Sequence, residues 1–317
     1  MKRTSQGGFT LIELMISLVL FSFAVAGVLA VAVSMTQGFR ENRMASSEEQ
    51  ATRVPMDFLT DAIRQAAPGV TDPTQVQDAD TCQNGAITVT DGGASGTDSL
   101  DLIYALGGVV TTVSTAYLSG TSLTVVDASQ LAVGDRILVS NLSQGHLFTI
   151  ASKSTNTLTL NAACGSVALP AAGYPAGSLV IRAQHATFSI GTTDGVPTLM
   201  MDPDSNGSAA AEPIADGVED LQVSLGIDTS TDGVSNPVGV GAGDDEWIYN
   251  VAGETPTAGT YRAVRVTLVA RSVGQLAGAS TVSTRPKIED HAVGTADNYR
   301  RRVLRAMVEM RNTGVSP

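Results

Sequence analysis

Hydrophobic and polar positions divide the chain into three parts, the first of which is an apolar run near the N-terminus. Residues 9–33 are apolar or small except for Glu13, the only charged residue in the range 4–39. As a helix, this run would extend about 38 Å, more than the roughly 30 Å of a bilayer's hydrocarbon core. It therefore predicts a transmembrane helix. Lys2 and Arg3 before it predict that the N-terminus stays in the cytoplasm and that the rest of the chain lies outside.

Residues 34–67 form the second part, in which basic and acidic side chains alternate among good helix formers. This pattern is typical of an exposed, amphipathic helical stalk. Pro55 lacks a backbone N–H and disfavours helix at the residue before it, so we expect a kink or a short break there. A second helix should then end near residues 67–69. Its apolar face, which should pack on the following domain, consists of Phe58, Leu59, Ala62, Ile63 and Ala66.

The third part, residues 70–317, consists of short apolar runs separated by clusters of Gly, Asp, Asn, Ser and Pro. This spacing favours antiparallel sheets over alternating strands and helices. The predicted fold class is therefore α+β: a long N-terminal hydrophobic helix followed by a large antiparallel β-sheet-rich globular domain. Residues 118–163 are interpreted as an inserted β-module. Residues 299–311 fit either a helix or a strand.

The charge distribution narrows the choice of partners. The chain carries a formal net charge of −12, and 21 of its 31 acidic residues lie between residues 65 and 284, together with only six basic ones. Such a domain should repel DNA and anionic lipid, so no nucleic-acid partner is expected. It could instead attract cations or a basic partner.

The motifs of the common enzyme classes do not occur in the sequence. The three histidines lack the spacing of zinc ligands, and there is no nucleophile elbow, phosphate loop or dinucleotide fingerprint. We therefore predict a protein that is not an enzyme and has no catalytic residues. Trp247 and Tyr249 could form a binding platform, although packing within a sheet is the favoured interpretation. The histidines are His146, His185 and His291.

Calcium is the only cofactor that the sequence suggests. Asp202, Asp204 and Asn206 match the first half of a calcium loop, in which oxygens at alternate positions converge on the ion. The twelfth position should be Glu and is Pro213. Because Asp and Asn are also common turn residues, a solvated turn is the favoured interpretation.

Two cysteines, Cys82 and Cys164, lie in the part of the chain that is predicted to be exported. An even number of cysteines in an oxidising compartment favours one intramolecular disulfide. Such a bond would stabilise the domain by roughly 2–5 kcal/mol. Two free thiols are the alternative.

The segment Gly7-Gly8-Phe9-Thr10-Leu11-Ile12-Glu13 resembles the class III leader of type IV prepilins. The resemblance implies that a prepilin peptidase removes residues 1–8 by cutting after Gly8 and then N-methylates Phe9. It also implies that residues 9–33 form the filament core after assembly. Glu13 would pair with the N-terminal amine of a neighbouring subunit, which would fix the register of one helix against the next.

Three later segments resemble one branch of this family, the PilW-like minor pilins. They are the run Asp216-Gly217-Val218-Glu219-Asp220-Leu221-Gln222-Val223 with the Gly226-Ile227-Asp228 that follows it, residues 131–139, and the basic segment 299–312. The last of these resembles a closing strand in that branch, which decides the interpretation of residues 299–311 in favour of a strand.

The resemblance implies a minor pilin of a type IV pilus, anchored by a single span in the inner membrane with its domain in the periplasm. Such a protein would enter the filament tip or the priming complex and initiate pilus assembly. The implied partners are the prepilin peptidase, other minor pilins, the major pilin, the assembly platform and, at the tip, an adhesin. Two alternatives are a pseudopilin of a type II secretion system and a tip-located adhesion or binding subunit.

Overall fold

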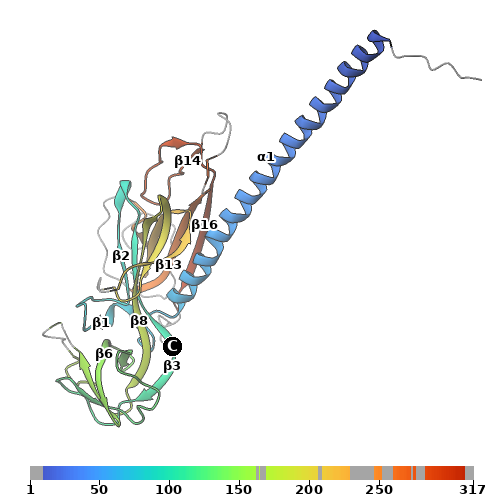
Figure 1. The fold of residues 1–317 in the computed structure, drawn as a ribbon. Helices are drawn as coiled ribbons and strands as arrows, with labels where there is room; N and C mark the ends of the chain where they lie inside the picture. Colours follow the sequence, from blue (N-terminus) through green and yellow to red (C-terminus); the bar gives the residue numbers. More distant parts are fainter. Residues whose placement is uncertain are drawn as a thin grey trace, which may run out of the picture. The chain divides into compact units, whose positions relative to one another are not determined.

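The computed structural model contains one long helix and a sheet-rich domain (Figure 1). It forms two compact units, Met1–Ser47 and Glu48–Pro317, and each is described by itself. In the first unit, one helical segment, Leu11–Thr36, is long and apolar enough to cross a membrane, with a mean hydropathy of 2.7. The residues that the structure describes are 10–161, 164, 169–205, 209–228, 246–251, 260–272, 274–275 and 283–310.

Helix α1 (Leu11–Arg64) continues through Pro55, so the short break and the separate second helix predicted there are wrong, while a kink at this proline stays a prediction. A proline inside a helix removes one backbone hydrogen bond and costs about 3 kcal/mol. Burial of the apolar residues that follow Pro55 offsets this cost, since each fully buried large apolar side chain contributes roughly 1.5–3 kcal/mol. The helix ends shortly before Ala67 and Gly69, which have positive φ values of 51° and 69°. A left-handed residue is a common helix stop.

The second unit contains a ten-stranded and a four-stranded sheet. The strands of the larger sheet are β1 (Val76–Asp78), β2 (Ile87–Thr90), β3 (Ser99–Thr112), β4 (Ser122–Thr124), β5 (Arg136–Ser140), β6 (Gly145–Ser154), β7 (Thr157–Asn161), β8 (Leu179–Thr193), β9 (Val196–Asp202) and β10 (Glu212–Asp216). The smaller sheet has the order β12 (Glu246–Ile248), β11 (Val218–Asp228), β13 (Thr260–Arg271) and β16 (Arg301–Glu309). Two short strands, β14 (Ser283–Thr284) and β15 (Ala296–Asp297), pair separately.

The strands pair mostly in the antiparallel direction, and the predicted α+β class is confirmed. Among the described strands, only β1 and β6 pair in parallel. The predicted strand at 299–311 is also confirmed, because β16 pairs with β13 from Arg301 to Glu309. In β13, Val264, Val266 and Leu268 are fully buried, as the period-2 pattern predicts, but Thr267 and Val269 on the opposite face are buried as well.

Strand β8 connects β9 and β10 to the part of the larger sheet that contains β5 and β6 (Figure 1). One of its edges pairs with β3 over most of its length. The other edge pairs first with β5, at residues 179–182, and then with β9, at residues 187–193. Strands β4 to β7 and the chain around them enclose a hydrophobic cluster of their own, which includes Leu123, Phe148 and Tyr174.

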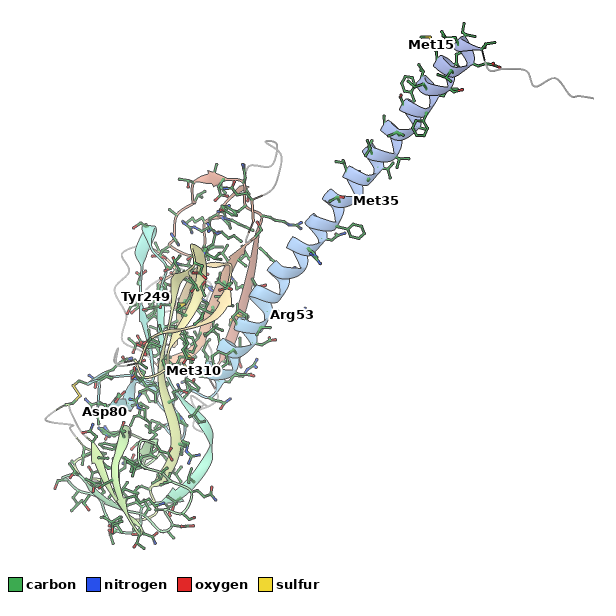
Figure 2. The ribbon with its side chains drawn as sticks, viewed as in Figure 1. Met15, Met35, Arg53, Asp80, Tyr249 and Met310 are labelled. Atoms are coloured by element: carbon green, nitrogen blue, oxygen red, sulfur yellow. A yellow bond between two sulfur atoms is a disulfide. The ribbon has the colours of Figure 1, made fainter. Side chains whose placement is uncertain are left out.

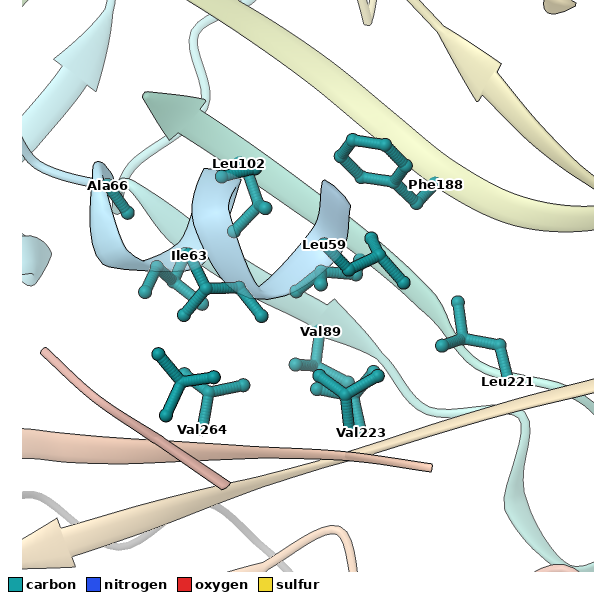
Figure 3. Packing of buried hydrophobic residues seen from close by; sticks show 14 of the residues in the cluster. Leu59, Ile63, Ala66, Val89, Leu102, Phe188, Leu221, Val223 and Val264 are labelled. Carbon is teal, nitrogen blue, oxygen red and sulfur yellow. The ribbon is translucent and has the colours of Figure 1, made fainter. Parts of the chain in front are cut away.

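The main core lies between the end of α1 and the two sheets (Figure 3). Leu59, Ile63 and Ala66 of the helix recur at the spacing of one helical face and are buried. The Phe58 ring packs edge-on against Phe188 of β8, with 5.8 Å between the ring centroids. The sheets contribute, among others, Val89, Leu102, Phe188, Leu221, Val223 and Val264.

Candidate functional site

The first turn of α1 holds Glu13 in a capping box with Thr10. The Thr10 backbone N–H donates to Glu13 Oε2 (3.1 Å), and the Glu13 backbone N–H donates to Thr10 Oγ1 (3.3 Å). The Thr10 hydroxyl also donates to Glu13 Oε2, at 3.0 Å. This reciprocal arrangement satisfies N–H groups that a helix N-terminus otherwise leaves free, and it places a carboxylate where the helix dipole favours negative charge. Gly8 and Phe9 lie outside the described residues.

The part of the chain that the structure describes shows no ion pair at Glu13. The residues on either side of it, Ile12 and Leu14, are 67% and 62% exposed. The carboxylate therefore lies on an open apolar surface, where its only partners among the described residues belong to the same helix turn.

The disulfide between Cys82 and Cys164 is present, with the two Cα atoms 5.4 Å apart (Figure 2, near Asp80). It joins the connection between β1 and β2 to the segment after β7. The Cys82 backbone N–H donates to Asp78 O (3.0 Å), and the Cys164 backbone N–H donates to Ala79 O (3.1 Å). The same short stretch of chain thus holds both cysteines in position.

The carboxylates of Asp202 and Asp204 hold their own turn together. Asp202 Oδ1 accepts from the backbone N–H groups of Asp204 (3.1 Å) and Ser205 (3.2 Å). Asp204 Oδ2 accepts from the Ala209 N–H at 3.1 Å. Asn206, the third residue of the suggested calcium loop, lies outside the described residues. These hydrogen bonds are those expected of a polar turn.

The three histidines are buried, and each contacts a polar partner far away in the sequence. His185 Nδ1 lies 2.6 Å from Asp78 Oδ2, His291 Nδ1 lies 2.9 Å from Asp220 Oδ2, and His146 Nδ1 contacts the Tyr174 hydroxyl. Sequence reasoning missed these pairs, because the partners are 107, 71 and 28 residues apart. All three therefore belong to the packed interior of the domain.

Asp78 has a charged partner in addition to its histidine. Besides His185, its Oδ2 accepts from Arg136 Nη2 at 2.6 Å. Burial alone would raise the pKa of Asp78, but the His185 hydrogen bond and the Arg136 charge outweigh burial and lower this pKa to about 2. Asp78 is therefore ionised throughout the physiological range.

Within the described residues, no basic side chain forms an ion pair with a second group of carboxylates. Asp91, Asp98 and Asp290 each bring one oxygen to within 4.8 Å of the others. Burial, and after it the charges of Asp91 and Asp290, raise the pKa of Asp98 to about 7. Burial and the charge of Asp91 likewise raise the pKa of Asp290 to about 6. Asp91 and Asp98 flank a glycine-rich segment, but nothing in the sequence connects Asp290 with them.

Comparisons with known proteins match both ends of the chain. Residues 187–312 match a family model described as type IV pilus-assembly protein W, and residues 3–29 match the prokaryotic N-terminal methylation motif. Among solved structures, a type IV-like pilin from Thermus thermophilus is 12% identical, with 57% of this chain and 86% of that chain covered and a TM-score of 0.23. No curated protein matches the sequence.

The two family matches support a likeness to type IV pilin-like proteins over residues 3–29 and 187–312. Such matches point to a structural protein rather than an enzyme. The C-terminal match contains two of the three segments that resemble PilW-like minor pilins, residues 216–228 and 299–312. Residues 131–139 lie outside it, so their resemblance to that branch stays a prediction.

Proposed function

We propose that this protein is a minor pilin that enters a type IV pilus at its tip or in its priming complex and initiates filament assembly. The observation that carries the proposal is Glu13, held in the first turn of an apolar helix that is long enough to span a membrane. An unpaired carboxylate is costly in that environment, so pairing it with a positive group stabilises whatever assembly supplies the partner.

In the proposed sequence of events, the prepilin peptidase cuts after Gly8 and methylates the new N-terminus at Phe9. The helix then anchors the chain in the inner membrane, with the domain in the periplasm. The amine at Phe9 of one subunit and the carboxylate of Glu13 in the next provide opposite charges close to the same helix end. Their pairing would set the register with the major pilin and with other minor pilins on the assembly platform.

The size of the globular unit supports a position at the tip. Residues 48–317 form one compact unit with two sheets. A subunit with such a domain is easier to accommodate where neighbours pack on one side only than along a compact shaft of many copies. An adhesin would be a further partner at that position.

The proposal is tested in a strain that lacks the gene. Surface pilin, sheared and quantified, should fall strongly while the major pilin accumulates in the membrane. The unchanged gene should restore the pili, and Glu13→Gln should not, although the mass of its mature N-terminus still shows cleavage after Gly8. Asp61→Asn is the matched control, because it neutralises a solvent-exposed carboxylate of the same helix.

Two results would contradict the proposal. Normal pili in the deletion strain would favour a pseudopilin of a secretion system or a dispensable binding subunit. Normal incorporation of the Glu13→Gln protein would show that charge pairing at this residue does not drive assembly.

A further inference from the structure

The carboxylates of Asp91, which is half-buried, and of Asp98 and Asp290, which are buried, come from two segments that the fold brings together. Asp91 directly follows β2, and Asp98 directly precedes β3. The short helix η2 (Gly93–Ser95) lies between them. Asp290 belongs to the connection between β14 and β15. The Ala292 N–H donates to Ala94 O at 3.0 Å, which ties this connection to η2.

Backbone hydrogen bonds hold the first two carboxylates in place. Asp98 Oδ1 accepts from the Gly92 N–H (3.0 Å), and Asp98 Oδ2 accepts from the Val223 N–H (2.7 Å). Asp91 Oδ1 accepts from the Gly93 N–H at 2.6 Å. The loop is closed so tightly that a Cβ atom on Gly92 would lie 2.4 Å from the Thr97 carbonyl oxygen. The positions of Asp91 and Asp98 are therefore set by the loop itself.

Asp290 is the member of the group whose partners are missing. Its residue is only 4% exposed, and neither carboxylate oxygen accepts a hydrogen bond from an N–H or O–H donor in the described structure. A carboxyl–carboxyl hydrogen bond with Asp91 requires a proton on one of the two groups, and it raises the pKa of Asp290. One of the Asp290 oxygens faces the oxygens of Asp91 and Asp98 within 4.8 Å. A buried carboxylate without a partner is strongly unfavourable, and two further carboxylates beside it add repulsion.

The other two buried aspartates that the structure describes, Asp78 and Asp220, each pair with an arginine and a histidine. Asp78 pairs with Arg136 and His185. Asp220 pairs with Arg285 at 2.9 Å and with His291, the residue next to Asp290. Because His291 Nδ1 is engaged with Asp220, that nitrogen is not directed at Asp290. Within the described ranges, no basic side chain forms an ion pair with any member of the group of three.

We propose that Asp91, Asp98 and Asp290 bind a divalent cation, and that this cation is calcium. Three carboxylates supply hard oxygen ligands, which calcium and magnesium prefer over the nitrogen and sulfur ligands of zinc. Calcium accepts six to eight oxygens in irregular arrangements and can complete its shell with backbone carbonyls and water, whereas magnesium requires a nearly ideal octahedron. Two of the three ligands come from one tight loop and the third from a turn far away in the sequence. Calcium tolerates such an irregular arrangement of ligands.

The bound cation would connect the segment of the smaller strand pair to the larger sheet. This site is distinct from the Asp202 loop that the sequence suggests, whose carboxylates accept hydrogen bonds from their own turn. It also does not depend on the role of Glu13 in filament assembly.

The test uses the full chain in detergent, freed of metal with a chelator and then dialysed at pH 7.5. Calcium chloride is titrated by calorimetry, and thermal unfolding is followed by circular dichroism with and without calcium. We expect saturable binding and a rise in Tm of several degrees, because a ligand that binds only the folded state stabilises it. Magnesium chloride at the same concentrations should have at least tenfold lower affinity.

Two variants locate the site. Asp290→Asn should weaken calcium binding at least tenfold and remove the Tm rise, while its Tm without calcium should equal or exceed that of the unchanged protein, since a repulsive charge is lost. Asp204→Asn should keep the full calcium response. Asp91→Asn, at a half-buried position, repeats the first test if Asp290→Asn fails to fold.

Three outcomes would overturn the proposal. The first is an absence of binding and of any Tm change in the unchanged protein up to 5 mM calcium, an upper limit set by the weak extracellular sites of roughly 0.1–1 mM affinity. That result would indicate that protons alone neutralise the group. The second is an Asp290→Asn variant that binds as tightly as the unchanged protein. The third is equal affinity for magnesium.

Discussion

Removing the disulfide should destabilise the domain by acting mainly on its unfolded state. The perturbation is the double variant Cys82→Ser, Cys164→Ser. The native contacts around the bond should largely persist, because the hydrogen bonds from the Cys82 and Cys164 N–H groups to Asp78 O and Ala79 O involve the backbone only. The folded state therefore loses little, and the unfolded chain gains the freedom that the cross-link had removed.

The size of the effect follows from the length of chain that the bond closes. The two cysteines are 82 residues apart. In the chain-entropy model, a loop of that length corresponds to about 15 cal/mol/K, or about 4.5 kcal/mol at 25 °C. Measured losses usually fall in the range of about 2–5 kcal/mol, so we expect the free energy of unfolding to fall by at least about 2 kcal/mol.

The assay is urea unfolding of the full chain in detergent. Fluorescence of Trp247, the single tryptophan, reports on the smaller sheet, where this residue is only 5% exposed. Far-UV circular dichroism reports on both sheets. As a control, reductant should move the unchanged protein toward the double variant and leave the variant unaffected. Equal urea midpoints and slopes for the oxidised protein and the variant would refute the reasoning.

Two further substitutions test the core and the buried charges. Leu59→Ala should lower the free energy of unfolding by about 3 kcal/mol, because Leu59 is fully buried between the helix and the sheets. The control Val54→Ala replaces an exposed residue of the same helix and should change the free energy of unfolding by under about 0.5 kcal/mol. An equal loss for both would contradict the assignment of the buried face. For Asp78, the folded-state pKa of about 2 lies below the ordinary 3.8, so the unfolded state takes up the proton first and stability falls as the pH drops. The stability difference between the unchanged protein and Asp78→Asn should therefore shrink by about 2 kcal/mol between pH 5 and pH 2. Urea unfolding at each pH measures this difference. A constant difference would show that Asp78 is not preferentially ionised in the folded state.

Local patterns in the sequence predict much of this fold. The apolar run around Glu13 predicts the first half of α1, and the alternation of Val264, Val266 and Leu268 predicts the burial of β13. The number of cysteines favours the disulfide. In each case the information lies within a few neighbouring residues or in the composition. The spacing at which apolar side chains recur distinguishes a helix from a strand.

Features that depend on contacts between residues far apart in the sequence could not be predicted in the same way. Pro55 favours a helix break by its local preference, but packing of the following turns into the core decides otherwise. The pairing of Asp78 with His185 and the approach of Asp290 to Asp98 depend on how strands far apart in sequence come together. The acidic loop at Asp202 has the stronger sequence pattern, yet the group of carboxylates without an ion-pair partner among the described residues lies at Asp91, Asp98 and Asp290.

The packing of the last turns of α1 against both sheets has a mechanical consequence. Leu59 and Ile63 belong both to the helix that carries the anchor and to the core that holds the domain together. A pull along the helix axis would therefore load the interior of the domain in shear rather than peel away a surface attachment. Under tension the domain should resist as a whole and then yield abruptly, because extracting the helix removes the centre of its own core.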